Sequence, residues 1–235
     1  MNGRIKRVED HKVGFPRIGQ IKVGKKSEKG YPMSVDYFIA TGKYAKLFTD
    51  AYGEKPQTIQ IVFPSDEAEQ VCNEKYEYRN DAGRLIAEGD GENFRVWNGQ
   101  SYQLLSTNDY PNLMSGIAKK YPNKKTKNGD GWDITLTLNF IVPMVKGVAG
   151  MWQFISKGTN STIPQIRETF DAMKAERGFV KGIIFDLSVK FATTQKPNDT
   201  SRFPVVSLVA NESEDNVMKI KEALKPIDVK KIENS

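Results

Sequence analysis

Residues 146–191 decide the fold of this chain and read KGVAGMWQFISKGTNSTIPQIRETFDAMKAERGFVKGIIFDLSVKF. The apolar run at residues 151–155 precedes the polar, glycine-containing residues 157–160, a pattern typical of a strand that ends in a loop. After the loop, apolar side chains recur at helical spacing: Ile163, Ile166, Phe170 and Met173. Gly178 then predicts a left-handed cap at the end of the helix.

The boundaries of this helix and the strand after it are also visible in the sequence. Thr162 is followed three residues later by Gln165, which is the spacing of a capping box and predicts that a helix begins there. Between residues 183 and 191 apolar and polar side chains alternate, with the period of a strand that has one buried face. The stretch therefore predicts a strand, a helix and a second strand.

Working outward, the first half of the chain favours antiparallel hairpins. One is predicted from residues 75–79 and 84–88, and another from 94–97 and 100–104 around an Asn-Gly turn. A short helix that carries Tyr44, Leu47 and Phe48 is predicted to begin at a Thr41 cap, and another helix lies near residues 112–118.

These patterns predict an α+β protein with largely antiparallel sheets. We expect a β-rich N-terminal domain at residues 1–118, a basic linker or loop at 119–131, and an α+β C-terminal domain at 132–235. In the C-terminal domain we expect two helices, near residues 163–177 and 214–224, to cover the sheet.

The composition argues against most catalytic chemistry. The chain of 235 residues has one cysteine, Cys72, and one histidine, His11, so neither a cysteine-cluster zinc site nor a serine triad can form within it. Its glycines match no phosphate-binding or dinucleotide-binding motif. We therefore expect no enzyme activity, no cofactor, and no catalytic, cofactor-binding or metal-binding residues.

The composition also bears on where the protein acts. No apolar run approaches membrane-spanning length, and residues 1–7 lack the apolar core of a signal peptide. A lone cysteine suits a reducing compartment. We expect a cytoplasmic protein that does not contact a membrane.

Positive charge is concentrated in two segments, and the net charge is +6. Basic side chains at such segments can contact nucleic-acid phosphates. The candidates are Arg4, Lys6, Arg7, Arg17, Lys25, Lys26, Lys119, Lys120, Lys124, Lys125 and Lys127. The alternative is that the first segment is a solvated extension and the second a solvated loop.

Several motifs together resemble the phage recombination directionality factor-like family. They are GFPRIGQIKVG (14–24), GYP (30–32), DYFIAT (36–41), IVFP (61–64), GRLIAEGDG (83–91), GMWQF (150–154) and FPV (203–205). The resemblance implies an accessory protein that binds a large serine integrase, largely through the coiled-coil region of the integrase. Binding would switch the integrase from integration toward excision. Its partners would be the integrase and the DNA that the integrase holds.

A second function stays open, namely a replication-associated protein that binds single-stranded DNA. Such binding combines a basic groove with aromatic side chains on which bases stack. The candidate aromatics are Tyr31, Tyr37, Tyr76, Tyr78 and Trp97. Packing within a sheet is the alternative explanation for them.

Overall fold

The computed structural model describes residues 15–123, 131–195 and 197–211. Its elements follow the order β1 (Arg17–Lys26), β2 (Pro32–Thr41), α1 (Ala45–Tyr52), β3 (Thr58–Val62), α2 (Ala68–Val71), β4 (Cys72–Arg79), β5 (Leu85–Gly89), β6 (Asn93–Trp97), β7 (Tyr102–Ser106), α3 (Leu113–Lys120), β8 (Trp132–Phe140), β9 (Met151–Ser156), α4 (Thr162–Arg177), β10 (Ile184–Thr193) and β11 (Arg202–Ala210).

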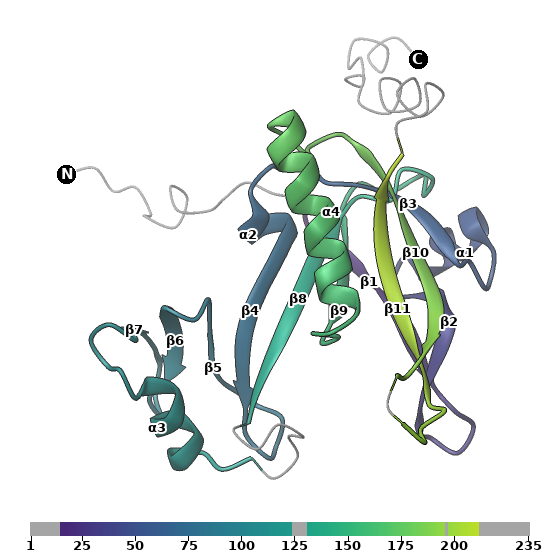
Figure 1. Cartoon of the computed structure of the whole chain (residues 1–235). Coiled ribbons are helices and arrows are strands. Elements are labelled where there is room, and N and C mark those ends of the chain that lie inside the picture. Colours follow the sequence, from purple (N-terminus) through teal and green to yellow (C-terminus); the bar gives the residue numbers. More distant parts are fainter. Residues whose placement is uncertain (1–14, 124–130, 196, 212–235) are drawn as a thin grey trace.

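The described strands form two sheets, one of eight strands in the order β2-β1-β9-β8-β4-β5-β6-β7 and one of three in the order β11-β10-β3. Neighbouring strands are antiparallel except β1 and β9, which are parallel. The predicted α+β class with largely antiparallel sheets is confirmed. Figure 1 shows α4 in front of the larger sheet, next to β11.

The predicted strand, helix and strand are present as β9, α4 and β10. Helix α4 buries Ile163, Ile166 and Phe170, and Gly178 ends it in the left-handed conformation with φ 77° and ψ −9°. The two strands belong to different sheets, because β9 pairs with β8 and β1 while β10 pairs with β3 and β11. Helix α4 therefore connects a strand of the larger sheet to a strand of the smaller one.

The two predicted threonine caps are wrong. Helix α4 has Ser161 at its N-cap and no side-chain cap, and the Thr162 hydroxyl instead accepts a hydrogen bond of 3.0 Å from the backbone N–H of Val206. Helix α1 begins at Ala45, and Thr41 is the last residue of β2. The Thr162 hydroxyl, which the local spacing predicted to cap α4, is therefore bonded to a backbone N–H of β11 instead.

Strands from before and after residues 119–131 pair with each other in both sheets, β4 with β8 and β3 with β10. The division into two domains at this segment stays a prediction. Lys119 and Lys120 lie in the last turn of α3 rather than in a linker. The helix predicted near residues 214–224 lies outside the described residues.

Two clusters of buried side chains hold the elements together. The larger one packs α4 and the three-stranded sheet against the larger sheet and contains Phe63, Phe170 and Phe185. The smaller one lies under α3 and contains Tyr78, Phe94 and Trp132, among others. Within the part of the chain that the structure describes, no helix is long and apolar enough to cross a membrane.

Candidate functional site

Strands β5, β6 and β7 with helix α3 form the α3 lobe, at one end of the larger sheet (Figure 1). The turn between β6 and β7 is built on Asn98 and Gly99: the Asn98 side-chain oxygen accepts from two backbone N–H groups, and Gly99 has φ 114°. Glycine adopts this conformation without steric strain. The predicted hairpin is confirmed, but its second strand begins at Tyr102 rather than at residue 100, because Asn98 pairs with Ser101.

Helix α3 is attached to the sheet by hydrogen bonds as well as by apolar packing. The indole Nε1 of Trp132 donates to the carbonyl of Met114 at 3.2 Å, and the hydroxyl of Tyr78 donates to the carbonyl of Tyr121 at 2.7 Å. Ile117 faces the core beneath the helix and is buried. These contacts place the helix over the outer strands of the lobe.

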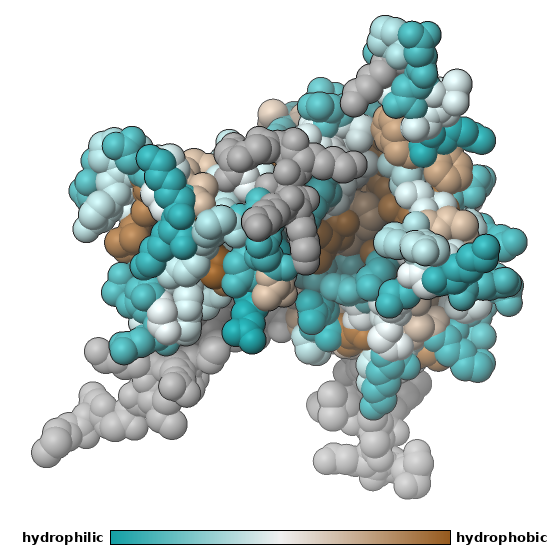
Figure 2. Space-filling model, turned by 90° about the horizontal axis from the view of Figure 1, so that it is seen from below, coloured by the Kyte–Doolittle hydropathy of each residue, from teal (hydrophilic) through white to brown (hydrophobic). Residues whose placement is uncertain are grey.

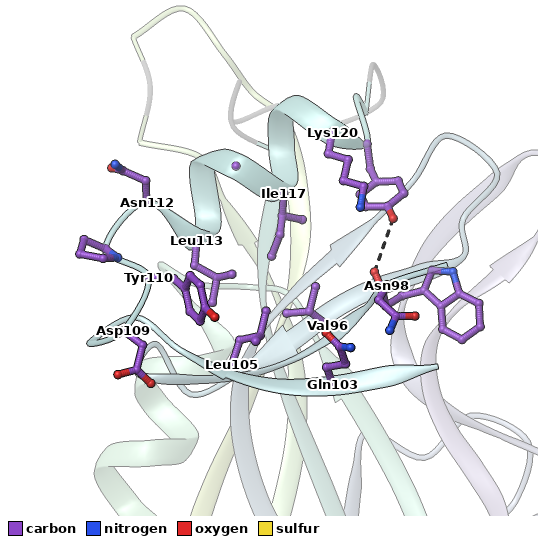
Figure 3. Close-up of a pocket in the computed structure, with 14 residues that line it drawn as sticks. Val96, Asn98, Gln103, Leu105, Asp109, Tyr110, Asn112, Leu113, Ile117 and Lys120 are labelled. Carbon is purple, nitrogen blue, oxygen red and sulfur yellow. Dashed lines mark hydrogen bonds between the residues drawn. The ribbon is translucent and has the colours of Figure 1, made fainter. Parts of the chain in front are cut away.

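A groove of about 510 Å³ remains between α3 and the strands β6 and β7; we call it the α3 groove (Figure 3). Val96, Leu105, Leu113 and Ile117 form its apolar floor, and Tyr110 stands at one side. Figure 2 shows hydrophobic residues between hydrophilic ones on the left-hand lobe, the part that holds α3 in Figure 1. An apolar floor with a polar rim is the usual anatomy of a surface that binds another protein.

The two ends of the α3 groove carry opposite charges. Asp109 lies at the end where β7 finishes, and Lys120 lies at the other end beside Asn98 (Figure 3). The ammonium of Lys120 is 5.3 Å from the centre of the Tyr121 ring. Complementary charges on a partner would set the direction in which it lies, because such pairs contribute mainly to specificity.

A family model described as recombination directionality factor-like matches residues 18–211. The chain belongs to the recombination directionality factor-like family. The match confirms the resemblance stated from the motifs, and it spans every element of the α3 lobe. No curated protein and no solved structure matches the chain.

The structure does not bring the predicted phosphate contacts of this directionality factor-like protein together. Lys25 and Lys26 end β1, whereas Lys119 and Lys120 end α3 at the opposite end of the larger sheet (Figure 1). Arg17 donates to the side-chain oxygen of Gln153 at 2.9 Å. The other candidates lie outside the described residues: Arg4, Lys6, Arg7, Lys124, Lys125 and Lys127. Nucleic-acid contact at these positions stays a prediction.

The candidate stacking aromatics of the family member differ in exposure. Tyr78 belongs to the buried cluster under α3, so it has no face for a base. Tyr31 is 69% exposed, and the ring of Tyr37 has the ammonium groups of Lys25 and Lys55 at 6.0 and 5.9 Å from its centre. Sheet packing explains Tyr78, Tyr31 is exposed, and the half-buried Tyr37 ring already has two lysine ammonium groups near it.

A carboxylate stabilises the α3 lobe of this directionality factor-like protein on the sheet face opposite the helix. Glu88 accepts hydrogen bonds from Lys75 and Arg95. Burial acts to raise the pKa of Glu88, but the hydrogen bond and charge of Lys75 and the charge of Arg95 lower it, and the pKa lies below its ordinary value of 4.5. The carboxylate is therefore held ionised in the folded protein.

Acidification is expected to remove the stabilisation that Glu88 provides. Its pKa is lower in the folded than in the unfolded chain, so the stabilisation is present above pH 4.5 and is lost as the pH falls through the folded value. We expect Glu88→Gln to lower Tm at neutral pH and to make the fall of Tm below pH 4.5 shallower. Glu28→Gln, an exposed matched control, should leave both unchanged, and equal curves for the two variants would contradict the assignment.

The sequence predicted the hairpin and the helix of this site, but it did not predict the groove between them. Leu113 and Ile117 are four residues apart on α3, and Val96 and Leu105 lie on separate strands. The helical spacing was a visible signal that α3 has an apolar face. No short sequence pattern indicated which strands this apolar face would pack against.

Proposed function

We propose that this protein is a non-catalytic accessory factor that binds the large serine integrase of its own mobile element. On binding, it favours recombination of the attL–attR pair over the attP–attB pair. The observation that carries the proposal is the family match over residues 18–211, because the family is one of accessory recombination factors. A factor of this kind needs no catalytic group, since a ligand that binds one conformation of a complex more tightly shifts the population toward it.

We assign the integrase contact to the α3 groove. Its volume of about 510 Å³ suits several apolar side chains, and helix α3, which lines one side of it, is attached to the sheet by the Trp132 and Tyr78 hydrogen bonds. A pre-formed surface costs less ordering entropy on binding than a mobile one. Asp109 and Lys120 at the two ends would fix the direction of the bound integrase segment.

The test is a recombination assay with the integrase of the same element, run in both directions with and without the protein, beside a pull-down. We expect excision to be favoured only when the protein is present. Tyr110→Ala and Lys120→Glu change exposed groove side chains and are expected to weaken binding at least about tenfold together, since anchor residues dominate interface energies.

Matched controls for these variants are Phe179→Ala and Lys190→Glu, which remove an exposed ring and reverse an exposed charge away from the groove. Both should switch direction as the unchanged protein does. If the controls fail and the groove variants do not, the contact surface lies outside the α3 groove. If no integrase binds and recombination keeps its direction, the proposed function is wrong.

Single-stranded DNA binding is the second candidate function. The observation that favours it is the position of the Tyr37 ring near the ammonium groups of Lys25 and Lys55. A base stacked there would have two cations close to its phosphates. Salt-dependent binding of an oligonucleotide that Tyr37→Ala removes, without any effect on the integrase, would put this function in place of the first.

A further inference from the structure

Each sheet in the described part of the chain has two edge strands, and an open edge recruits another strand because its backbone N–H and C=O groups lack partners. In the smaller sheet, α4 covers the edge of β11. The Thr162 hydroxyl accepts from the N–H of Val206 at 3.0 Å, and the Thr169 hydroxyl donates to the carbonyl of Leu208 at 2.8 Å. Pro204 has no N–H to offer.

The edge of β3 is covered too. Val62 exchanges two backbone hydrogen bonds of 2.9 Å with Ile141, and the Tyr52 hydroxyl bonds both the N–H and the carbonyl of Gln60. Strand β2, at one edge of the larger sheet, packs against β10 and β11, and the N–H of its Phe38 donates to a loop carbonyl. Side chains and loops thus occupy three of the four edges.

Strand β7 is the fourth edge, and no residue in the described part of the chain covers it. The N–H of Asn98 donates to the carbonyl of Ser101 at 3.0 Å, which makes that pair a hydrogen-bonded one. Hydrogen-bonded and non-hydrogen-bonded pairs alternate along a hairpin, so the backbone groups of Tyr102 and Leu104 point away from β6. The open edge ends at Ser106, whose carbonyl accepts from Tyr110.

The open edge also presents an apolar side chain, Leu104, which is 77% exposed. Leu104 shares its face of the sheet with Tyr102, two residues earlier. The guanidinium of Arg95 lies 4.6 Å from the centre of the Tyr102 ring, and the Trp97 ring centre lies 5.3 Å from it. Contacts with Arg95 and Trp97 thus fix the position of the Tyr102 ring, next to the exposed Leu104.

We propose that β7 pairs antiparallel with β7 of a second copy of this chain, about a two-fold axis at Gln103. In this register Tyr102 lies opposite the partner's Leu104, and the two outward-facing residues of each strand exchange four backbone hydrogen bonds. The exposed leucine of each chain then covers the held tyrosine of the other. The edge is self-complementary because Tyr102 and Leu104 flank Gln103 symmetrically.

The charges along the strand favour the same arrangement. Asp109 lies at the finishing end of β7 and Lys120 at the starting end (Figure 3). An antiparallel two-fold pair brings the Asp109 end of each copy beside the Lys120 end of the other, so the ends that come together carry opposite rather than like charges.

The pairing has a consequence for function. A two-fold axis perpendicular to the sheet keeps both helices α3 on one face, so the dimer presents two α3 grooves side by side. If the grooves hold integrase segments, as proposed above, the dimer is bivalent and gains avidity without new contacts. The pairing itself does not depend on that function.

The test measures the mass of the full chain by sedimentation over a range of concentrations. We expect a species of twice the chain mass of 26.5 kDa. Leu104→Lys should raise the dissociation constant at least about tenfold, because an edge lysine blocks strand pairing. Val209→Lys introduces the same lysine at a 58% exposed position on the covered edge β11 and should leave the dimer intact.

A second variant fixes the register. Gln103→Cys places two thiols opposite each other at the axis, at a Cα separation of about 4.5 Å that a disulfide can bridge. We expect it to cross-link under oxidation, whereas Gln100→Cys, in the exposed turn, should not; the native Cys72 is buried. A chain that stays monomeric, or equal dissociation in Leu104→Lys and Val209→Lys, overturns the pairing. A monomer that still redirects the integrase would leave the proposed function in place.

Discussion

Replacing Phe170 by alanine is expected to lower the free energy of unfolding by about 3–5 kcal/mol. Phe170 is 0% exposed and lies on α4, where its ring packs against Phe63 of the main core. Its ring centre is 5.3 Å from that of Phe63 in an edge-on arrangement, and Phe63 in turn lies 5.2 Å from Phe185 on β10. The alanine would leave a cavity where the helix and both sheets meet.

Urea denaturation at neutral pH, followed by circular dichroism, measures this change as a shift in the midpoint. Phe179→Ala is the matched control, because the same side chain is 48% exposed there, just beyond the end of α4. It should change stability by less than about 0.5 kcal/mol. Similar losses for the two variants would mean that the core is not organised around Phe170.

Replacing Gly89 by alanine is expected to destabilise the α3 lobe by about 1–3 kcal/mol or more. A Cβ atom there would lie 2.2 Å from the carbonyl oxygen of Asn93 and 2.6 Å from the ring of Phe94. Gly89 pairs with Phe94 on β6 and with Tyr76 on β4, so the backbone cannot move aside without breaking the sheet. The strain therefore falls on the pairing of β5 with β6, and β6 forms part of the floor of the α3 groove.

Gly116→Ala makes the same substitution in helix α3 with the opposite expected sign. Apart from the adjacent residues and the backbone of the helix itself, no atom of the described residues lies within 4 Å of the Cβ that it adds, and alanine in a helix is more stable than glycine by about 0.5–1 kcal/mol. The two variants should shift the urea midpoint in opposite directions. A stabilised Gly89→Ala protein would show that β5 and β6 do not pack as closely as the structure has them.

Local patterns in the sequence predicted most of the individual elements. The left-handed Gly178 and the alternation of residues 183–191 are confirmed where they were expected, and the hairpin at Asn98 and Gly99 is present with its second strand two residues later. Each depends on a few neighbouring residues, whose backbone preferences and hydrophobic period act at fixed spacing along the chain. The family resemblance, too, was carried by short motifs.

The pairing of distant strands was decided only by the tertiary structure. The parallel contact of β1 with β9, the entry of β3 into the sheet of β10, and the capture of the Thr162 hydroxyl by Val206 all join residues far apart in the chain. The α3 groove and the open edge of β7 arise in the same way. No fixed spacing encodes such contacts, because they depend on which apolar faces and backbone groups still lack partners once the local elements have formed.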